Sequence, residues 1–141
     1  HRRLLIINGH GGNSFKNMIR DLSLDYPDFL IATSEWFTFV PAKEYFDEPG
    51  DHADELETSV MMHYHPALVV LSEAGEGTSK KFAWRMLNEK VAWIPRHWMK
   101  VSEDTGIGNP KKASAEKGKR YVEAVTAKYA QLFKELTEEI Y

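Results

Sequence analysis

Hydrophobic residues near the start of the chain form short continuous runs separated by a segment with helical spacing. Residues 4–7 are all apolar, which predicts a strand buried on both faces. Residues 13–26 predict a helix, because their apolar side chains lie three and four positions apart, at Phe15, Met18, Ile19 and Leu22. Residues 29–32 form a second run of strand length. A strand, a helix and a strand within about 30 residues predict two parallel strands in one sheet.

The rest of the chain alternates helical segments with polar connections. Residues 54–65 predict a helix that Pro66 ends, and residues 91–94 predict a further strand. Residues 102–112 are rich in Gly, Asn and Pro and predict a loop. Residues 114–140 predict the last helix, because apolar residues recur along it at helical spacing. These residues are Tyr121, Val125, Tyr129, Leu132, Leu136 and Ile140. The pattern indicates one α/β domain, or the larger part of one.

The composition restricts the partners that we expect. The chain has 18 Lys and Arg against 21 Asp and Glu, so no basic face and no nucleic-acid partner are predicted. It has no cysteine among its 141 residues, so any metal has to be held by histidine and carboxylate side chains. No apolar run approaches the roughly 20 residues that cross a bilayer, and no signal peptide is visible. We therefore expect no membrane partner and a cytoplasmic location.

His10 directly follows the first predicted strand and has glycine on both sides. The carboxyl ends of parallel strands are where α/β sheets bind ligands, and glycine lets other groups come close. His10 is therefore a candidate ligand of a metal such as zinc or manganese, although a histidine here also serves as an ordinary hydrogen-bonding residue. The run does not fit the spacing of a phosphate loop or a dinucleotide site, so no nucleotide is expected.

Glu57 and His52 stand at the start of the helix predicted over residues 54–65. Glu57 has two interpretations. With Asp54 it forms a capping box, or it lies on the apolar side of the helix, where a carboxylate requires a partner such as a divalent cation. His52 is either a functional residue that Asp51 orients or a solvated loop histidine.

Three segments of the chain resemble the creatininase (creatinine amidohydrolase) family of dinuclear metal hydrolases. Residues 8–13 match its NGHGGN motif in full. Residues 52–59 match its HAGExETS motif except at Asp54, where glycine is usual. Residues 105–118 resemble its late SGVxGDPxxATAEKG segment, with Asn109 in place of the usual aspartate. The segments keep the order of the family and span most of the chain.

The resemblance implies a three-layer α/β/α fold with a largely parallel sheet, and hydrolysis of a C–N bond in a cyclic or linear amide. It implies two divalent cations per subunit, which are zinc, manganese or iron. His10 and Glu57 would be metal ligands, Glu57 and His52 catalytic residues, and His52 and Gly11 substrate-binding residues. We expect His10, His52 and Glu57 to converge on one cleft about 10 Å across. Creatininase has a glutamate ligand where this chain has Gly12, so creatinine is not the expected substrate, and relatives with NGHGGN include formamide hydrolases.

The family's N-terminal ligand motif, ExHGxHLPxxTD, has no counterpart in the chain. We therefore expect residues 1–141 to be the C-terminal part of a single creatininase-like domain, with an incomplete sheet, and to be inactive alone. The resemblance also implies a homo-oligomer, a hexamer, for which exposed aromatic residues are candidate contacts. These are Trp36, Phe37, Trp93 and Trp98. The alternative is a non-catalytic member that binds a small molecule or serves as an assembly domain.

Overall fold

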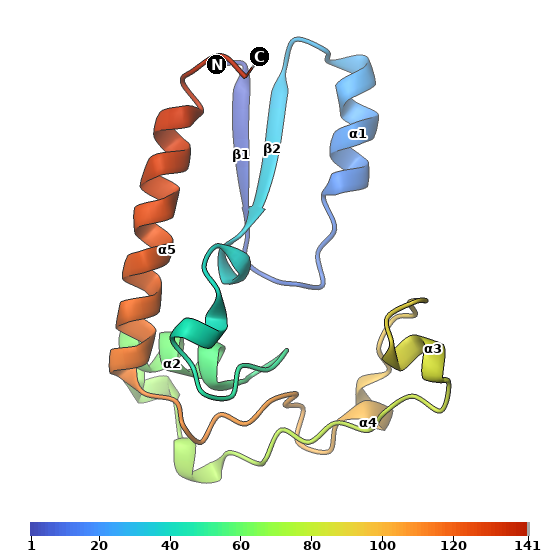
Figure 1. The fold of residues 1–141 in the computed structure, drawn as a ribbon, viewed down its shortest axis with the longest axis vertical. Helices are drawn as coiled ribbons and strands as arrows, with labels where there is room; N and C mark the ends of the chain where they lie inside the picture. The colour runs from blue at the N-terminus through green and yellow to red at the C-terminus, as the bar shows by residue number, and fades with distance from the viewer. Residues whose placement is uncertain (141) are drawn as a thin grey trace. The chain divides into compact units, whose positions relative to one another are not determined.

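The computed structural model describes residues 1–140 and divides into two compact units, whose elements are labelled in Figure 1. The first unit consists of His1–Pro41 and Glu123–Tyr141, and the second of Ala42–Val122. The prediction that residues 1–141 belong to a single domain stays a prediction.

Two parallel strands form the centre of the first unit, as the sequence predicts. β1 (Arg3–Asn8) and β2 (Leu30–Glu35) pair along their whole length, with Asn8 opposite Glu35. α1 (Lys16–Asp25) connects them, since a parallel partner has to begin at the same end of the sheet. Both strands therefore end at the same edge, where Asn8 and Glu35 lie side by side.

Helices lie on both sides of this sheet. Figure 1 shows α1 on one side of β1 and β2, and the C-terminal half of α5 (Ala115–Glu135) on the other. The hydroxyl of Tyr129 in α5 shares a hydrogen bond of 3.0 Å with Ser34, and its ring centroid lies 4.1 Å from that of Phe39. This helix–sheet–helix layering is the predicted α/β fold class.

β1 is less buried than its apolar run predicts. Leu4 and Ile7 are 46% and 48% exposed, so the prediction of a strand buried on both faces is wrong for these two residues. The sheet of the described residues has two strands, which leaves one edge of β1 without a neighbouring strand.

α5 ends at Glu135, earlier than the predicted residue 140. The Thr137 hydroxyl donates to the Lys134 carbonyl at 2.7 Å, and the Arg3 guanidinium donates to the Leu136 carbonyl. Side chains thus satisfy carbonyls at the helix end, so the helix does not need to continue. Three residues of the predicted apolar stripe are buried, namely Tyr121, Val125 and Tyr129.

The second unit is built around the contact between α2 (Glu55–Tyr64) and the start of α5. A Cβ on Gly118 would lie 2.0 Å from the Ser59 carbonyl oxygen, so glycine permits the two backbones to touch. Tyr121 is completely buried, and its ring centroid lies 5.2 Å from that of Phe46. This aromatic pair forms part of the core of the unit.

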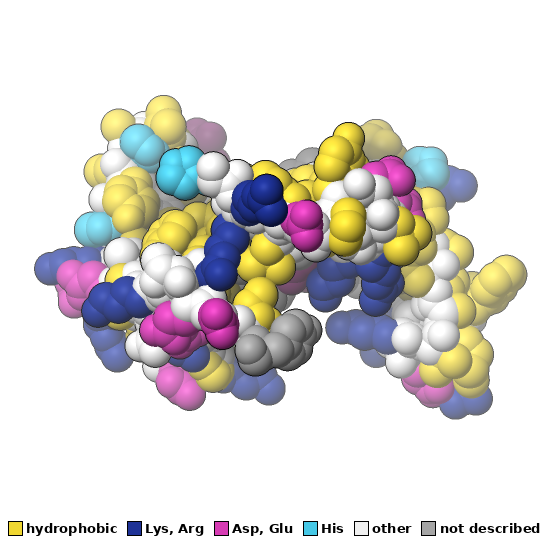
Figure 2. All heavy atoms as spheres, turned by 90° about the horizontal axis from the view of Figure 1, so that it is seen from above, with side chains coloured by type: hydrophobic (Ala, Val, Ile, Leu, Met, Phe, Trp, Pro, Cys, Tyr) yellow, Lys and Arg dark blue, Asp and Glu magenta, His cyan; other side chains and the backbone are white. Residues whose placement is uncertain are grey.

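The other elements are short. α3 is Arg85–Asn88 and α4 is Trp98–Val101, and the 3-10 helices are Trp36–Thr38, Ala42–Glu44, Pro66–Leu68 and Leu71–Glu73. The prediction of a strand over residues 91–94 is wrong, because these residues are irregular and pair with no strand of the described chain. Val91 and Trp93 are 71% and 82% exposed. Hydrophobic side chains on the surface appear in yellow in Figure 2. None of the helices described is both long and apolar enough for a membrane crossing.

Candidate functional site

β1 ends in a tightly bonded loop that carries His10. The buried side-chain oxygen of Asn8 accepts hydrogen bonds from the His10 backbone N–H and from the Asn13 side chain, both at 3.1 Å. The Asn13 N–H donates to the His10 carbonyl at 3.0 Å. Asn13 therefore closes this loop, and α1 begins at Lys16, not at residue 13 as predicted.

Gly12 orients the imidazole of His10. Its backbone N–H donates to Nδ1 at 2.9 Å, so the neutral ring carries its proton on Nε2. A Cβ at position 12 would lie 2.9 Å from two ring atoms, so this ring position requires glycine. A metal bound through Nε2 would require the proton to move to Nδ1 and this hydrogen bond to break.

Two aromatic residues pack on the same loop. The Phe37 ring lies 3.5 Å from the position of a Cβ on Gly11, and the Trp36 indole donates to the Gly9 carbonyl at 3.4 Å. Trp36 and Phe37 are half-buried. Both residues were predicted as subunit contacts, and both already contact the loop of their own chain.

A capping box begins α2, which is one of the two interpretations of Glu57. Oδ1 of Asp54 accepts from the Glu57 N–H at 2.9 Å, and Oε2 of Glu57 accepts from the Ala53 N–H at 2.7 Å. The second oxygen of Asp54 accepts from the Gly50 N–H at 2.6 Å. Asp54 thus supplies a helix cap at the position where HAGExETS has glycine.

The backbone on both sides of His52 is constrained. Ala53 has φ of +48°, in the left-handed region that residues with a Cβ rarely adopt. Such a conformation costs on the order of 1 kcal/mol and persists where the surroundings enforce it. The His52 N–H and carbonyl also pair with Ile107, at 3.0 and 2.8 Å.

The structure brings the side chains of His52 and Glu57 together. Nδ1 of His52 lies 3.9 Å from Oε2 of Glu57, and the side chains are 34% and 40% exposed. Glu57 is therefore half-buried, and the interior carboxylate of α2 is Glu55, which is completely buried. Of the two interpretations of Glu57, the capping box is observed, and its carboxylate is only partly withdrawn from solvent. The buried carboxylate, Glu55, has a cation of the second unit as its partner.

That cation is Lys117. Its ammonium group donates to Glu55 at 2.5 Å and to Asp47 at 2.8 Å, and Glu55 also accepts from the Glu48 N–H at 2.6 Å. The hydrogen bonds to Asp47 and then Glu55 hold the pKa of Lys117 above its usual value. This network ties the start of α5 to the start of α2, the helix that carries Glu57.

Glu57 also lines a cavity of about 450 Å³ in the second unit. Met61 and residues 68–71 supply much of its apolar wall, and Asp104 and Gly106 contribute to its polar part. Small-molecule sites have volumes of about 300–1,000 Å³ and combine an apolar lining with a few polar groups. Capping is therefore not the sole contact of Glu57.

Asp104 fixes two loops of this cavity. It accepts hydrogen bonds from the Gly77 and Gly106 N–H groups, each at 3.0 Å, and from the Ser102 hydroxyl at 3.2 Å. The Gly77 bond is the largest cause that lowers the pKa of Asp104 below its usual value.

Three residues lie beside candidate residues without having been predicted there, Trp98 and Arg96 near His52 in the second unit and Glu35 at the strand end in the first. Trp98 has its ring centroid 4.8 Å from that of His52, and the Arg96 guanidinium lies 4.8 Å from the Trp98 centroid. No spacing rule connects residues so far apart in the chain. Glu35 ends β2 opposite Asn8 and lines a polar cavity of about 370 Å³. The rule that singled out His10, a polar residue at a strand end, also applies to Glu35.

The structure therefore groups His52 with Glu57 in the second unit and places His10 and Gly11 in the first. The convergence of His10 with the other two residues stays a prediction. Among residues 1–140, no group of three or more His, Asp or Glu side chains is arranged to hold a metal ion.

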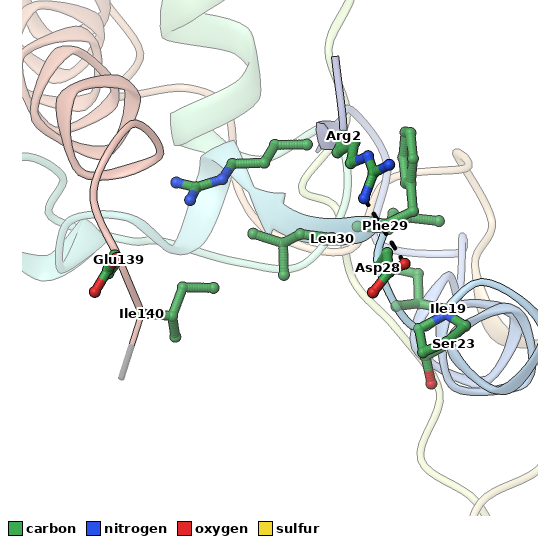
Figure 3. A pocket seen from close by; sticks show the side chains of 11 residues that line it. Arg2, Ile19, Ser23, Asp28, Phe29, Leu30, Glu139 and Ile140 are labelled. Carbon is green, nitrogen blue, oxygen red and sulfur yellow. Dashed lines mark ion pairs between the residues drawn. The ribbon is translucent and has the colours of Figure 1, made fainter.

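A larger cavity lies elsewhere. It has a volume of about 650 Å³ in the first unit and is lined by Arg2, Asp28, Leu30 and Ile140 among others, as Figure 3 shows. Arg2 and Asp28 form an ion pair there at 3.7 Å. This is the end of the sheet where the strands begin, opposite to the edge at which α/β sheets bind ligands. We assign no function to it.

Comparisons with known proteins agree with one another. The family model of creatininase, described as creatinine amidohydrolase, matches residues 1–133. A protein from Bacteroides fragilis NCTC 9343, proposed to be a creatinine amidohydrolase, is 61% identical, with a TM-score of 0.94 over 99% of this chain and 56% of that one. A creatininase structure is 24% identical, with a TM-score of 0.70 over 98% of this chain and 57% of that one. A creatininase variant complexed with creatine is 23% identical, with a TM-score of 0.72 over 95% and 56%.

At 23% and 24% identity, the two creatininase structures show that the fold is shared and no more. A search of curated proteins found no match. The chain spans little more than half the length of these solved structures, 56% to 57%. The family model covers nearly all of the chain. The chain therefore belongs to the creatininase family.

Proposed function

We propose that the whole protein is a metal-dependent amidohydrolase that cleaves a C–N bond, other than a peptide bond, in a cyclic or linear amide. The observation that carries this proposal is the pairing of His52 with Glu57 at the start of α2, where Glu57 also lines a cavity of small-molecule size. A carboxylate and an imidazole near such a cavity are the groups that general acid–base catalysis uses. Membership of the creatininase family supports a C–N bond as the bond that is cleaved.

We assign two divalent cations, zinc, manganese or iron, to each subunit of the whole protein. His10 and Glu57 offer the nitrogen and oxygen donors that these cations bind, and two related creatininase structures are a Zn-Zn type and a manganese form. Two side chains do not complete about four donors for each ion, so the whole protein would have to supply further donors. Bound cations would polarise the amide carbonyl and lower the pKa of water.

The chain's own residues have distinct roles in this proposal. Oε2 of Glu57 accepts from the Ala53 N–H, so we assign proton transfer to Oε1. His52, whose Nδ1 lies 3.9 Å from Oε2 of Glu57, contacts the substrate or passes a proton to the leaving nitrogen. We also assign substrate binding to Gly11, next to His10, through its backbone.

Small amides of the formamide type fit the proposal better than creatinine. The difference lies at position 12, where creatininase carries a glutamate ligand and this chain has glycine. A side chain there would contact the His10 ring at 2.9 Å, so the His10 conformation of this chain is incompatible with that ligand.

We also propose that the whole protein is a homo-oligomer, a hexamer by family resemblance. Trp93 is the strongest candidate contact, because it is 82% exposed, whereas Trp98 packs against His52. Light scattering on the purified whole protein should give a mass of several subunits. A monodisperse monomer would contradict the assembly.

One observation favours a second candidate function, binding of a small molecule without catalysis. The Gly12 N–H occupies Nδ1 of His10, and metal binding would have to break that hydrogen bond. A family member that has lost its metals would retain the cavity beside Glu57.

One experiment separates the two. The whole protein is stripped with a chelator, reloaded with Zn²⁺ or Mn²⁺, and analysed for metal content and for hydrolysis of creatinine, N-methylformamide and acetamide. We expect about two metal ions per subunit, as in a dinuclear site, and hydrolysis of N-methylformamide or acetamide in preference to creatinine. A protein that takes up no metal and hydrolyses none of the three is a binding domain.

A further inference from the structure

We propose that Trp98 is a positioning residue that fixes the imidazole of His52, and that Arg96 holds Trp98 in place by pairing with Asp51. The inference rests on the proposed function, since it takes His52 as a group that acts on the substrate. It concerns residues outside the three family-like motifs, brought to His52 from a distant part of the same unit.

The side chain of His52 has rotational freedom that a ring contact can limit. Its backbone is held by Ile107, but the side chain still rotates about two bonds and is 34% exposed. Its Nδ1 lies 3.9 Å from Oε2 of Glu57, which is longer than a hydrogen bond. A contact on the face of the ring would restrict its orientation further.

Trp98 supplies that contact. The ring centroids of His52 and Trp98 lie 4.8 Å apart with 56° between the planes, within the range of attractive aromatic contacts. The indole covers part of the imidazole surface and leaves fewer ring orientations available. Nδ1 then stays near Glu57, on the side of the ring where the proton has to move.

Trp98 is in turn held from two sides. It begins α4, a helix of four residues, which is too short to be stable by itself. The Lys80 N–H donates to the Val101 carbonyl at 2.7 Å and holds the end of this helix. At its start, the Arg96 guanidinium lies 4.8 Å from the Trp98 centroid, in a cation–π contact.

The ion pair of Arg96 with Asp51 closes the arrangement. Asp51 lies 45 residues from Arg96 along the chain and is the direct neighbour of His52. The pair therefore ties the segment that carries Trp98 to the segment that carries His52. Arg96 acts on His52 through Trp98, which is why we call both positioning residues and neither catalytic.

The first test measures the His52 ring itself and needs no substrate. The ring protons of His52 in the whole protein, assigned with His52→Gln, are compared by NMR between the wild type and Trp98→Leu. Because the indole ring current acts on a neighbouring imidazole, we expect the His52 signals to shift in Trp98→Leu and less in Trp98→Phe. Trp84→Leu is the matched control, since Trp84 is 71% exposed and should leave the signals unchanged. Unshifted His52 signals in a folded Trp98→Leu would overturn the proposal.

The second test separates positioning from substrate contact. With N-methylformamide, Trp98→Leu should lower kcat by at least about tenfold, as misplacement of a reacting group does, while KM stays within about twofold. Trp98→Phe should recover most of kcat, and Trp84→Leu should match the wild type. A raised KM with normal kcat would mean that Trp98 binds substrate and would overturn the proposal. If Trp98→Leu does not fold, Arg96→Met makes the same comparison with a smaller change. A wild type that hydrolyses no amide refutes the proposed function, and the NMR result then decides the positioning alone.

Discussion

Glu55 and Lys117 are joined by a hydrogen bond of 2.5 Å, and the carboxylate of this pair is completely buried whereas the ammonium side chain is 24% exposed. Lys117 lies in the first turns of α5 and Glu55 begins α2, so the pair joins the two helices at the point where their backbones touch. A buried carboxylate is stable in its charged form only with such a partner.

Replacing Lys117 with methionine should therefore destabilise the protein strongly. Removing one partner of a buried pair costs about 3–5 kcal/mol, and the partial exposure of Lys117 places the expected loss near about 3 kcal/mol. Urea denaturation of the purified whole protein measures it. Lys112→Met is the matched control, because Lys112 pairs with Glu48 at 2.7 Å on the surface, where such pairs contribute little to stability. Equal losses in both variants would show that the burial of Glu55 has no energetic consequence.

Glu57→Gln should abolish catalysis but not folding. The amide keeps an oxygen that accepts from the Ala53 N–H and so preserves the capping box, but it is neither a base nor a good metal ligand. We expect kcat/KM to fall by at least about 10²-fold in the metal-loaded whole protein, with the free energy of unfolding changed by at most about 1 kcal/mol. Glu116→Gln, on the exposed side of α5, should leave both quantities unchanged. Normal turnover of Glu57→Gln would remove Glu57 from the active site.

Gly118→Ala should destabilise the protein, although alanine favours helices over glycine by about 1 kcal/mol. The new Cβ would lie 2.0 Å from the Ser59 carbonyl oxygen, which is backbone and cannot move aside like a side chain. Overpacking of this kind costs about 1–3 kcal/mol, and a backbone contact places the loss at the upper end. Thermal unfolding compares this variant with Thr126→Ala, an exposed position of the same helix. A stabilised Gly118→Ala would mean that α2 and α5 do not pack this closely.

The loops around the cavity should loosen in acid through Asp104. The folded-state pKa of Asp104 lies below the usual 3.8, mainly because its carboxylate accepts a hydrogen bond from the Gly77 N–H. Burial raises this pKa, but the hydrogen bonds from Gly77, the Gly106 N–H and the Ser102 hydroxyl together outweigh that effect. A carboxyl with a lowered pKa contributes stability above its unfolded pKa and loses it as the pH falls through the folded value. The free energy of unfolding should therefore drop more steeply below pH 4 in the wild type than in Asp104→Asn. Parallel curves for the two proteins would show that Asp104 does not hold these loops.

Local patterns predicted the first unit well. The apolar runs at residues 4–7 and 29–32 identified two parallel strands, because a crossover helix between them leaves few other arrangements. The same reasoning failed at residues 91–94, whose composition suits a strand but which has no strand to pair with in the described structure. Whether an extended segment pairs with another strand depends on residues far away in the sequence. The composition of the segment itself contains no information about those residues.

The candidate site was predicted only where its groups are close in sequence. Asp54 and Glu57 form the capping box that their spacing predicts, and His52 lies beside Glu57 as expected. Trp98 was assigned to a subunit contact instead, since its approach to His52 depends on the fold of the intervening residues. Glu55 was overlooked for the same reason, because its partner Lys117 is 62 residues away.

The departures from the family-like motifs have local explanations. Asp54 caps α2 where glycine is usual, and Oδ1 of Asn109 accepts from the Lys111 N–H at 3.0 Å, as an aspartate oxygen at that position also would. The turn at Asn109 therefore needs an acceptor and not a charge. Compared with the motifs, Asp54 and Asn109 are exceptions. Their hydrogen bonds show that each supplies an acceptor for a backbone N–H.

The contact of Tyr129 with Ser34 and Phe39 also has a consequence for biosynthesis. The first unit is discontinuous in sequence, because it combines the opening 41 residues with a segment that begins at Glu123, whereas the second unit is one continuous stretch. As the chain leaves the ribosome from its N-terminus, β1 and β2 emerge long before the part of α5 that covers them. The second unit is completely synthesised before the C-terminal segment of the first unit. Until the last part of the chain is made, the parallel strands lack this cover. A nascent-chain chaperone would find the surface at Ser34 and Phe39 exposed during that interval.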